Sequence, residues 1–380
     1  MKKLCFALGA IMLLVGCGSN RDRVEKTLEN GVEVVFNHLE PYQIKGESGR
    51  LRLEKQFSID LENSELLKIG LTDIETFDID SDGMIYVIQW HVKGDYIYKF
   101  DGNGKFLGSF CRYGQGPGEI EWGGIVMAVG DGEIIAKDPS KRKFLVYSRD
   151  GKFLRETPLP NVLEIEARFD DGTYLVHWQD QFSDPNNLID HVALCDSTFA
   201  SMNEILLYKF PNALRAEKIV VGEATYIIGA SKDRIFIGDS RRGYEIEVRD
   251  RTGRIVRKIR KAYTPVNIDE KFKTVYLARF RDGDPWKSKY QFAKSWPPFR
   301  YMFTDDEGRL FVMTREPGAK PGEFTYDIFD KAGAFIGRTS LGNSDPYHPR
   351  TAVAMMGRIY SLNNSDSGYK ELVVYKAIWE

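Results

Sequence analysis

Cysteine is scarce in this sequence, with four residues in 380 and no pair at Cys-x-x-Cys spacing. Zinc ribbons and dithiol redox sites need that spacing, so both classes are excluded. Outside the N-terminal segment only Cys111 and Cys195 occur, which permits at most one disulfide. Two buried free thiols are the expected alternative, because nothing else in the sequence suggests a disulfide-built domain.

Neither acidic nor basic residues are in clear excess. The 53 basic residues nearly balance the 55 acidic ones, for a net charge of -2, and they form no basic block. A nucleic-acid partner is therefore not expected. Beyond the N-terminus no apolar run approaches the ~20 residues of a membrane-spanning helix. The Gly-x-Ser-x-Gly and His-Glu-x-x-His motifs of hydrolases and metalloproteases are also missing.

The N-terminus carries an export signal. Lys2 and Lys3 precede a short apolar segment, and the run ends in Leu14-Val15-Gly16-Cys17, which looks like a bacterial lipobox. We expect a signal peptide over residues 1–16, an acylated Cys17, and a lipid anchor to the cell envelope, most simply the outer membrane, with the side left open. An ordinary signal peptide is the alternative. Residues 17–50 are expected to form a tether and a small hairpin at Asn30-Gly31.

The remaining chain repeats one pattern. Two alternating strands joined by a tight turn are followed by a second such pair, as in residues 77–110. The turns of the first hairpins fall at Asp82-Gly83, Asp131-Gly132, Asp171-Gly172, Lys232-Asp233, Glu307-Gly308 and Met356-Gly357. Six four-stranded units predict an all-β fold, a six-bladed β-propeller over residues 51–380. The last unit lacks a fourth strand, and Leu51–Leu61 is the expected donor. Residues 261–298 break the pattern and predict a helical insertion between blades four and five.

Several phrases resemble the six-bladed β-propeller lipoproteins of Bacteroidetes, relatives of NHL-repeat propellers. They are Leu14 to Cys17, "DGMIYV", "YKFDGNGKFLGSF" and "RYGQGPGEI". The resemblance covers nearly all of the chain after the lipobox and implies the propeller fold and an envelope location. It implies little about activity, because propellers host many unrelated functions.

Two motifs could be mistaken for binding loops. Gly114, Gly116, Pro117, Gly118 and Glu119 are rich in glycine, but Pro117 removes a donor and no Gly-Lys-Ser/Thr follows, so an inter-blade linker is predicted rather than a phosphate loop. Asp78, Asp80 and Asp82 match the start of a calcium loop. Its twelfth position is Gln89 rather than glutamate, which favours a hairpin with solvated carboxylates over a calcium site.

One face of the predicted propeller carries the candidate site. Loops after second strands and inter-blade linkers open on a common face, and the candidates there are Trp90, His91, Lys141, Arg142, His177, Trp178, Arg241, Arg242 and Arg315. Scattered surface charge is one interpretation. The other is a rim that binds an anion or sugar, with Trp90 and Trp178 as stacking platforms.

The favoured function is therefore a binding or scaffold module for a glycan or protein ligand on this face. It needs no cofactor and is not expected to be an enzyme, because no complete catalytic set occurs. The alternative is a metal-dependent hydrolase or lyase of the central funnel, which would use calcium or a transition metal and the histidines His91 and His177.

Overall fold

The structure is a computed structural model, and it describes residues 24–42, 49–90, 93–121, 127–129, 132–159, 163–343, 351–365 and 367–380. The expected signal peptide and Cys17 lie outside these ranges. Within the described ranges, no helix is long and apolar enough to cross a membrane.

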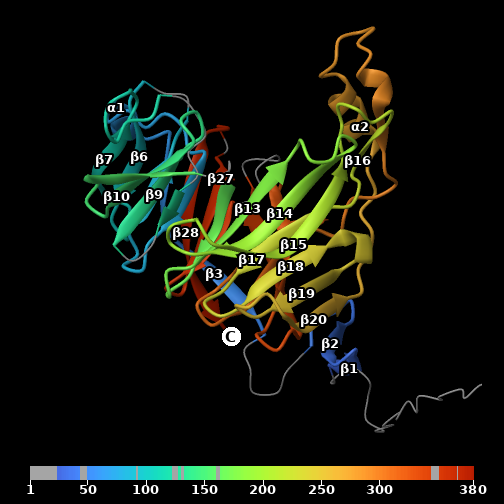
Figure 1. Cartoon of the computed structure of the whole chain (residues 1–380). Coiled ribbons are helices and arrows are strands. Elements are labelled where there is room, and N and C mark those ends of the chain that lie inside the picture. Colours follow the sequence, from blue (N-terminus) through green and yellow to red (C-terminus); the bar gives the residue numbers. More distant parts are fainter. Residues whose placement is uncertain are drawn as a thin grey trace, which may run out of the picture.

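Six four-stranded antiparallel units make up most of the molecule (Figure 1). They confirm the predicted six-bladed architecture. Their strands are β4 (Thr76–Ile79), β5 (Ile85–Ile88), β6 (Asp95–Phe100) and β7 (Phe106–Arg112) in blade one; β8 (Met127–Val129), β9 (Glu133–Asp138), β10 (Lys143–Ser148) and β11 (Phe153–Pro158) in blade two; β12 (Leu163–Arg168), β13 (Tyr174–Asp180), β14 (Asn187–Cys195) and β15 (Met202–Pro211) in blade three; β17 (Tyr226–Ala230), β18 (Ile235–Asp239), β19 (Glu245–Arg249) and β20 (Ile255–Lys261) in blade four; β22 (Phe299–Thr304), β23 (Leu310–Pro317), β24 (Glu323–Phe329) and β25 (Phe335–Gly342) in blade five; and β26 (Ala352–Met355), β27 (Arg358–Asn364), β28 (Lys370–Trp379) and β3 (Leu51–Asp60) in blade six.

The first strands of successive blades form the inner ring. Contacts join β4 to β8, β8 to β12, β12 to β17, β17 to β22 and β22 to β26. The second strand of each blade is packed between the sheets of the two neighbouring blades, so both of its faces are covered. All residues of β5 and β18 are accordingly buried, and their sequences read as continuous apolar runs rather than strict alternation.

The recurring turns are built by aspartate. The Asp80 carboxylate accepts hydrogen bonds from the N–H groups of Asp82 and Met84, both at 2.9 Å. Asp250 caps a later turn in the same way, accepting from Thr252 N at 2.9 Å and Arg254 N at 3.2 Å. These side chains replace water as acceptors for the turn's N–H groups, which explains why aspartate recurs through the repeats.

The ring is closed as the sequence predicted. β3 pairs antiparallel with β28, from Leu51 opposite Trp379 to Asp60 opposite Glu371. The sixth blade therefore contains one strand from before blade one and three from the end of the repeats. Closure in this way covers an edge that β28 would otherwise expose.

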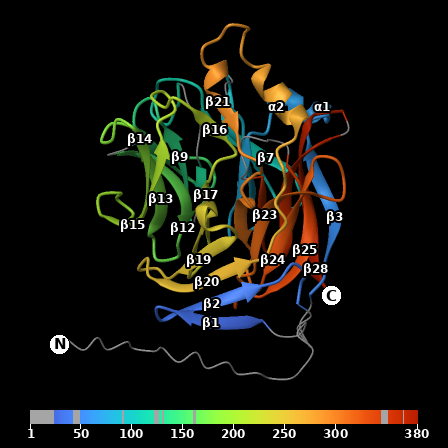
Figure 2. The same cartoon turned by 90° about the vertical axis from the view of Figure 1, so that its right-hand side faces the viewer.

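The hairpin at Asn30-Gly31 forms, with an addition that the sequence did not indicate. β1 (Glu25–Glu29) and β2 (Val32–Asn37) pair with each other, and β2 also pairs in parallel with β20. Blade four thus becomes a six-stranded sheet. Figure 2 shows β2 and β1 lying in succession outside β20.

A buried charge cluster joins blades four and five. Lys261 Nζ lies 3.3 Å from Asp327 Oδ2, and both side chains are 1% exposed. Asp327 also accepts from Tyr244 Oη and Arg338 Nε, each at 2.9 Å. Burial lowers the pKa of Lys261, an effect that the Asp327 carboxylate opposes. Every oxygen of Asp327 therefore has a partner, as a buried carboxylate requires.

The predicted insertion is a projecting arm, residues 263–298 (Figure 1). It contains α2 (Glu270–Leu277), which Asp269 caps by accepting from Phe272 N at 2.6 Å. Its short strand β21 (Tyr290–Phe292) pairs in parallel with β16 (Ile219–Val221). A second helix, α1 (Ser64–Lys68), lies in the segment between β3 and β4. Aromatic rings hold the arm together: Phe272, Tyr276, Phe280, Tyr290, Phe292 and Trp296.

Candidate functional site

The two ends of the ring differ in which connections they carry. Because the strands of each blade alternate in direction, the turns between first and second strands and between third and fourth strands share one face, here called the turn face. The loops between second and third strands share the opposite face with the inter-blade linkers, here called the linker face. The candidate residues from the sequence belong to the linker face.

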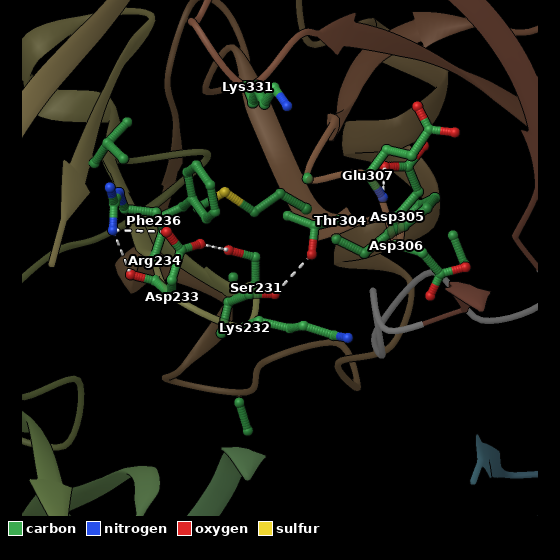
Figure 3. Close-up of a pocket in the computed structure, with 18 of the residues that line it drawn as sticks. Ser231, Lys232, Asp233, Arg234, Phe236, Thr304, Asp305, Asp306, Glu307 and Lys331 are labelled. Atoms are coloured by element: carbon green, nitrogen blue, oxygen red, sulfur yellow. Dashed lines mark hydrogen bonds and ion pairs between the residues drawn. The ribbon is translucent and has the colours of Figure 1, made fainter. Parts of the chain in front are cut away.

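A cavity of about 650 Å³ opens on the turn face. Its walls come from the inner strands β12, β17, β22 and β26, and its mouth comes from the first-hairpin turns of blades three, four and five (Figure 3). The volume is within the range of pockets that hold small organic ligands. The cavity therefore lies at the opposite end of the ring from the predicted rim.

The floor of the cavity is largely apolar. Ile228, Ala230, Tyr301, Val353 and Met355 line it and are only half-buried, although they sit on inner strands. In the sequence these positions look like any other core residues. The exposed apolar surface at this depth suits a ligand with an apolar face.

Acidic side chains around the mouth are mostly engaged. Asp305 and Glu307 both pair with Arg309, and Asp233 pairs with Arg234 at 2.8 Å. These ion pairs neutralise part of the negative charge that the turn sequences bring to this face. The acidic turns are thus structural in large part.

Three further acids line the mouth. Asp306 accepts from the N–H of Gly357 at 3.1 Å, and Asp330 accepts from the N–H of Ala334 at 2.8 Å. Asp170 is exposed. No ion pair joins any of the three to another described residue, so their negative charge remains at this mouth.

Two basic side chains at the same mouth have no partner among the described residues. Lys232 and Lys331 are exposed, and neither ammonium makes a hydrogen bond or ion pair within the described part of the chain. Figure 3 shows them on opposite sides of the space. Deeper in, the Arg168 guanidinium lies over the Tyr174 ring at 5.9 Å, and its Nη1 is buried without a hydrogen-bond partner in the described ranges.

Neighbouring arginines fix the turns that carry the two lysines. Arg251 Nη1 donates to the carbonyl of Lys232 at 3.4 Å, and Arg257 Nη1 donates to the carbonyl of Lys331 at 2.9 Å. Arg257 is itself held by Glu33 of the added hairpin, with Nε 2.5 Å from Oε1. The β1–β2 hairpin therefore supports the cavity mouth as well as covering an edge.

One predicted residue contacts a residue of the cavity wall. His177 Nδ1 lies 2.7 Å from Oε1 of Glu166, which lines the cavity. Burial lowers the pKa of His177, but the carboxylates of Glu166, Glu164 and Asp190 outweigh it, so the pKa is raised above its ordinary value. Across the described residues, no group of three or more His, Cys, Asp or Glu side chains is arranged to hold a metal ion.

The other predicted rim residues lie on the linker face and do not gather into one site. Arg241 pairs with Asp239 at 2.8 Å and covers the Tyr208 ring at 3.7 Å. Arg242 binds Glu245 at 3.1 Å and also Glu247, both within its own blade. The structure thus assigns both arginines a structural role that the sequence could not indicate.

The aromatic candidates of the rim are also engaged. Trp178 stacks on His191 with ring centroids 4.8 Å apart, and Trp90 packs against the core between blades one and two. Lys141 and Arg142 occupy the exposed loop between β9 and β10, and His91 lies outside the described residues. Arg315 is half-buried beside the arm, where it faces Trp296.

The glycine-rich phrase is an inter-blade connection between β7 and β8. It folds back on itself, with Gly114 N donating to Ile120 O and Ile120 N donating to Arg112 O, both at 3.0 Å. The Glu119 carboxylate accepts from Gly116 N at 2.9 Å, in the space where a phosphate would have to sit. Its own side chain therefore fills this loop.

The expectation of solvated carboxylates in the first hairpin was wrong for Asp80. That residue is 2% exposed, and its Oδ2 accepts from Tyr86 Oη at 3.0 Å. Both carboxylate oxygens of Asp80 are therefore engaged, Oδ1 by the turn and Oδ2 by Tyr86. Cys111 and Cys195 are buried free thiols, as expected.

Comparison with known proteins agrees with this architecture. Residues 58–221 match the model of a family described as DUF5128, 6-bladed beta-propeller. The structure has six blades, and blades one to three lie inside the matched region. The chain is a six-bladed β-propeller. No curated protein matches it.

Solved structures are similar to this propeller in fold. A DUF4221 family member from Bacteroides vulgatus ATCC 8482 is 12% identical, with a TM-score of 0.51, over 88% of this chain and 99% of that chain. A protein of Bacteroides fragilis NCTC 9343 described as exported is 14% identical, with a TM-score of 0.49, over 91% and 99%. At these identities the likeness concerns the fold alone.

The sequence reasoning missed the cavity residues because their turns look like ordinary hairpin turns. A signal was nevertheless present. The turn of blade four reads Ser231-Lys232-Asp233-Arg234 and lacks the glycine that the first turns of the other five blades carry. A departure from the repeat at one blade is where a shared scaffold commonly acquires its own specificity.

Proposed function

We propose that this propeller is an exported, lipid-anchored binding protein whose ligand occupies the cavity on the turn face. The ligand class that fits is a small glycan or related polyol bearing a negatively charged group. The observation that carries the proposal is the pair of unengaged cations, Lys232 and Lys331, above an apolar floor.

The chemistry of the mouth supports an acidic ligand. Charge-assisted hydrogen bonds from lysine to a carboxylate or sulfate are stronger than neutral ones. Asp233, Asp305 and Glu307 already pair with arginines, which weakens their repulsion of an anion. Tyr301 and the aliphatic floor residues would contact the apolar face of a sugar ring.

This proposal moves the ligand from the linker face, where the sequence placed it, to the turn face. Arg241 and Arg242 form ion pairs with acids of blade four. A ligand there would have to break those pairs and compete with buried carboxylates for the arginines. The cavity imposes no such cost.

Binding of acidic and neutral sugars tests the proposal. Titration calorimetry would compare uronate-containing disaccharides with neutral disaccharides of the same size. We expect the Lys232→Ala/Lys331→Ala variant to bind the acidic sugars at least tenfold more weakly, because about 1 kcal/mol or more is lost at each lysine. The matched control is Lys68→Ala/Lys141→Ala, which removes two exposed lysines from the linker face. Equal affinity of both double variants would contradict a ligand in the cavity.

The anchor has its own test. The lipobox ending in Cys17 supports acylation of that residue. Metabolic labelling with a fatty acid should mark the protein, and Cys17→Ala should remove the label and release the protein from the membrane fraction. Label that persists in the variant would contradict acylation at this site.

A further inference from the structure

A further basic residue without an ion-pair partner among the described residues, Arg315, lies on the linker face at the base of the arm. Arg315 follows the buried part of β23, where regular pairing with β24 is interrupted between Met313 and Pro317. Within the interruption Thr314 Oγ1 donates to Thr325 O at 2.9 Å and accepts from Glu316 N at 3.1 Å. The strand therefore bulges at Arg315, and bulges commonly redirect a side chain.

The guanidinium of Arg315 lies on an aromatic surface. Its Cζ is 4.5 Å from the centroid of Trp296, which belongs to the arm. Its Nε is buried and makes no hydrogen bond to any described residue. Stacking on an indole leaves the edge of a guanidinium available for a planar oxyanion.

Among the described residues, no carboxylate forms an ion pair with Arg315. Burial and the nearby Arg300 lower its pKa to about 10. The closest acids by position are already engaged, since Glu316 pairs with Arg338 at 3.6 Å and Asp327 is held by Lys261 and Arg338. By contrast, Arg309, Arg241 and Arg260 each have a carboxylate within 3 Å. A partly buried arginine beside another arginine is unfavourable unless an anion joins them.

A small hollow opens next to this residue. It is lined by Arg315, Tyr263 and Pro297 and also by the acids Glu316 and Asp327, and its volume is about 10 Å³. Both acids already pair with Arg338. The volume of the hollow is close to that of one water-sized probe. It therefore admits one oxygen of an anionic group, while the rest of the ligand would lie outside, against the arm.

We propose that Arg315, supported by Trp296, binds the oxyanion of a carboxylate- or phosphate-bearing solute at the base of the arm. This site is distinct from the cavity, which opens on the turn face, and it does not depend on the proposed sugar ligand. Bidentate pairing with the guanidinium edge would supply specificity for a planar carboxylate or for two phosphate oxygens.

Titration of the purified protein with two simple anions tests the site. Benzoate probes a carboxylate with a flat apolar body, and inorganic phosphate probes the phosphate group. Chemical-shift changes or tryptophan fluorescence would report binding, with Trp296→Phe identifying the fluorescent signal. We expect saturable binding of at least one anion, weakened at least tenfold in Arg315→Met and less in Arg315→Lys, which keeps the charge without the planar fork.

Two controls separate binding from packing. Arg315→Met retains an apolar contact with Trp296, so a melting temperature close to that of the wild type would show that the fold is intact. Arg309→Met removes an arginine of the turn face and should leave anion affinity unchanged. Titration in the Lys232→Ala/Lys331→Ala background separates this site from anion binding in the cavity. Absence of saturable binding in the wild type, or equal affinity in Arg315→Met, would overturn the proposal.

Discussion

The charge cluster between blades four and five makes a quantitative prediction about stability. Asp327→Asn removes one negative charge and leaves Lys261 and Arg338 facing each other in a buried space. Removing one partner of a buried ion pair costs about 3–5 kcal/mol, because the other charge stays desolvated. At about 2.1 cal/mol/K of unfolding entropy per residue, 4 kcal/mol lowers the melting temperature of this chain by roughly 5 °C.

Proton loss from Lys261 limits that cost and gives it a pH dependence. Burial already lowers the pKa of Lys261, and without Asp327 the pKa should fall further. Below the ordinary lysine value of 10.5 the folded variant would then bind fewer protons than the unfolded chain, so its stability increases as pH rises toward that value. The deficit of Asp327→Asn relative to the wild type should be larger at pH 7 than at pH 9.5.

Thermal unfolding followed by circular dichroism at the two pH values measures this. Lys68→Met is the matched control, because Lys68 pairs with Glu65 on an exposed helix where both side chains are about 70% exposed. Such a pair contributes under about 1 kcal/mol. If Asp327→Asn melted within 1 °C of Lys68→Met, or if its deficit were the same at both pH values, the reasoning about the buried cluster would be refuted.

Two further predictions concern the linker and the thiols. Gly118→Ala should destabilise the protein more than Gly172→Ala in thermal unfolding: both glycines have positive φ, +73° and +79°, but an added Cβ at Gly118 would lie 2.7 Å from the Phe153 ring, whereas at Gly172 nothing lies within 4 Å. Similar losses of stability in the two variants would show that the Phe153 ring moves aside at little cost and would contradict this prediction. In a chain beginning at residue 18, Cys111 and Cys195 should resist a thiol reagent at pH 8 until denaturant is added, because burial raises the pKa of each thiol to about 12; rapid reaction of the native protein would contradict this.

Local features made the blades predictable from the sequence. An aspartate that caps a turn and a glycine with positive φ act within four or five residues, so Asp80 and Gly83 can be recognised without knowledge of the rest of the fold. The donor strand Leu51–Leu61 could be inferred because the repeats left one blade incomplete. The helical insertion followed from the spacing of Phe272 and Tyr276.

The site was not predictable in the same way, because it depends on residues far apart in sequence. Whether Lys232 is available and Arg242 engaged depends on which acids the ring brings beside them. The sequence around each residue is similarly polar. The parallel docking of β2 on β20 escaped prediction for a related reason, since an outer strand presents the same backbone groups to any partner.

The pairing of β3 with β28 also bears on how the molecule assembles. Arg52 and Glu380, which bond at 2.8 Å across this pair, are separated by 328 positions. Contacts of such sequence separation form slowly, because a long loop must close before they contribute. A partly synthesised chain cannot complete the ring, and the same delay leaves the β3 edge open to chaperones until β28 pairs with it.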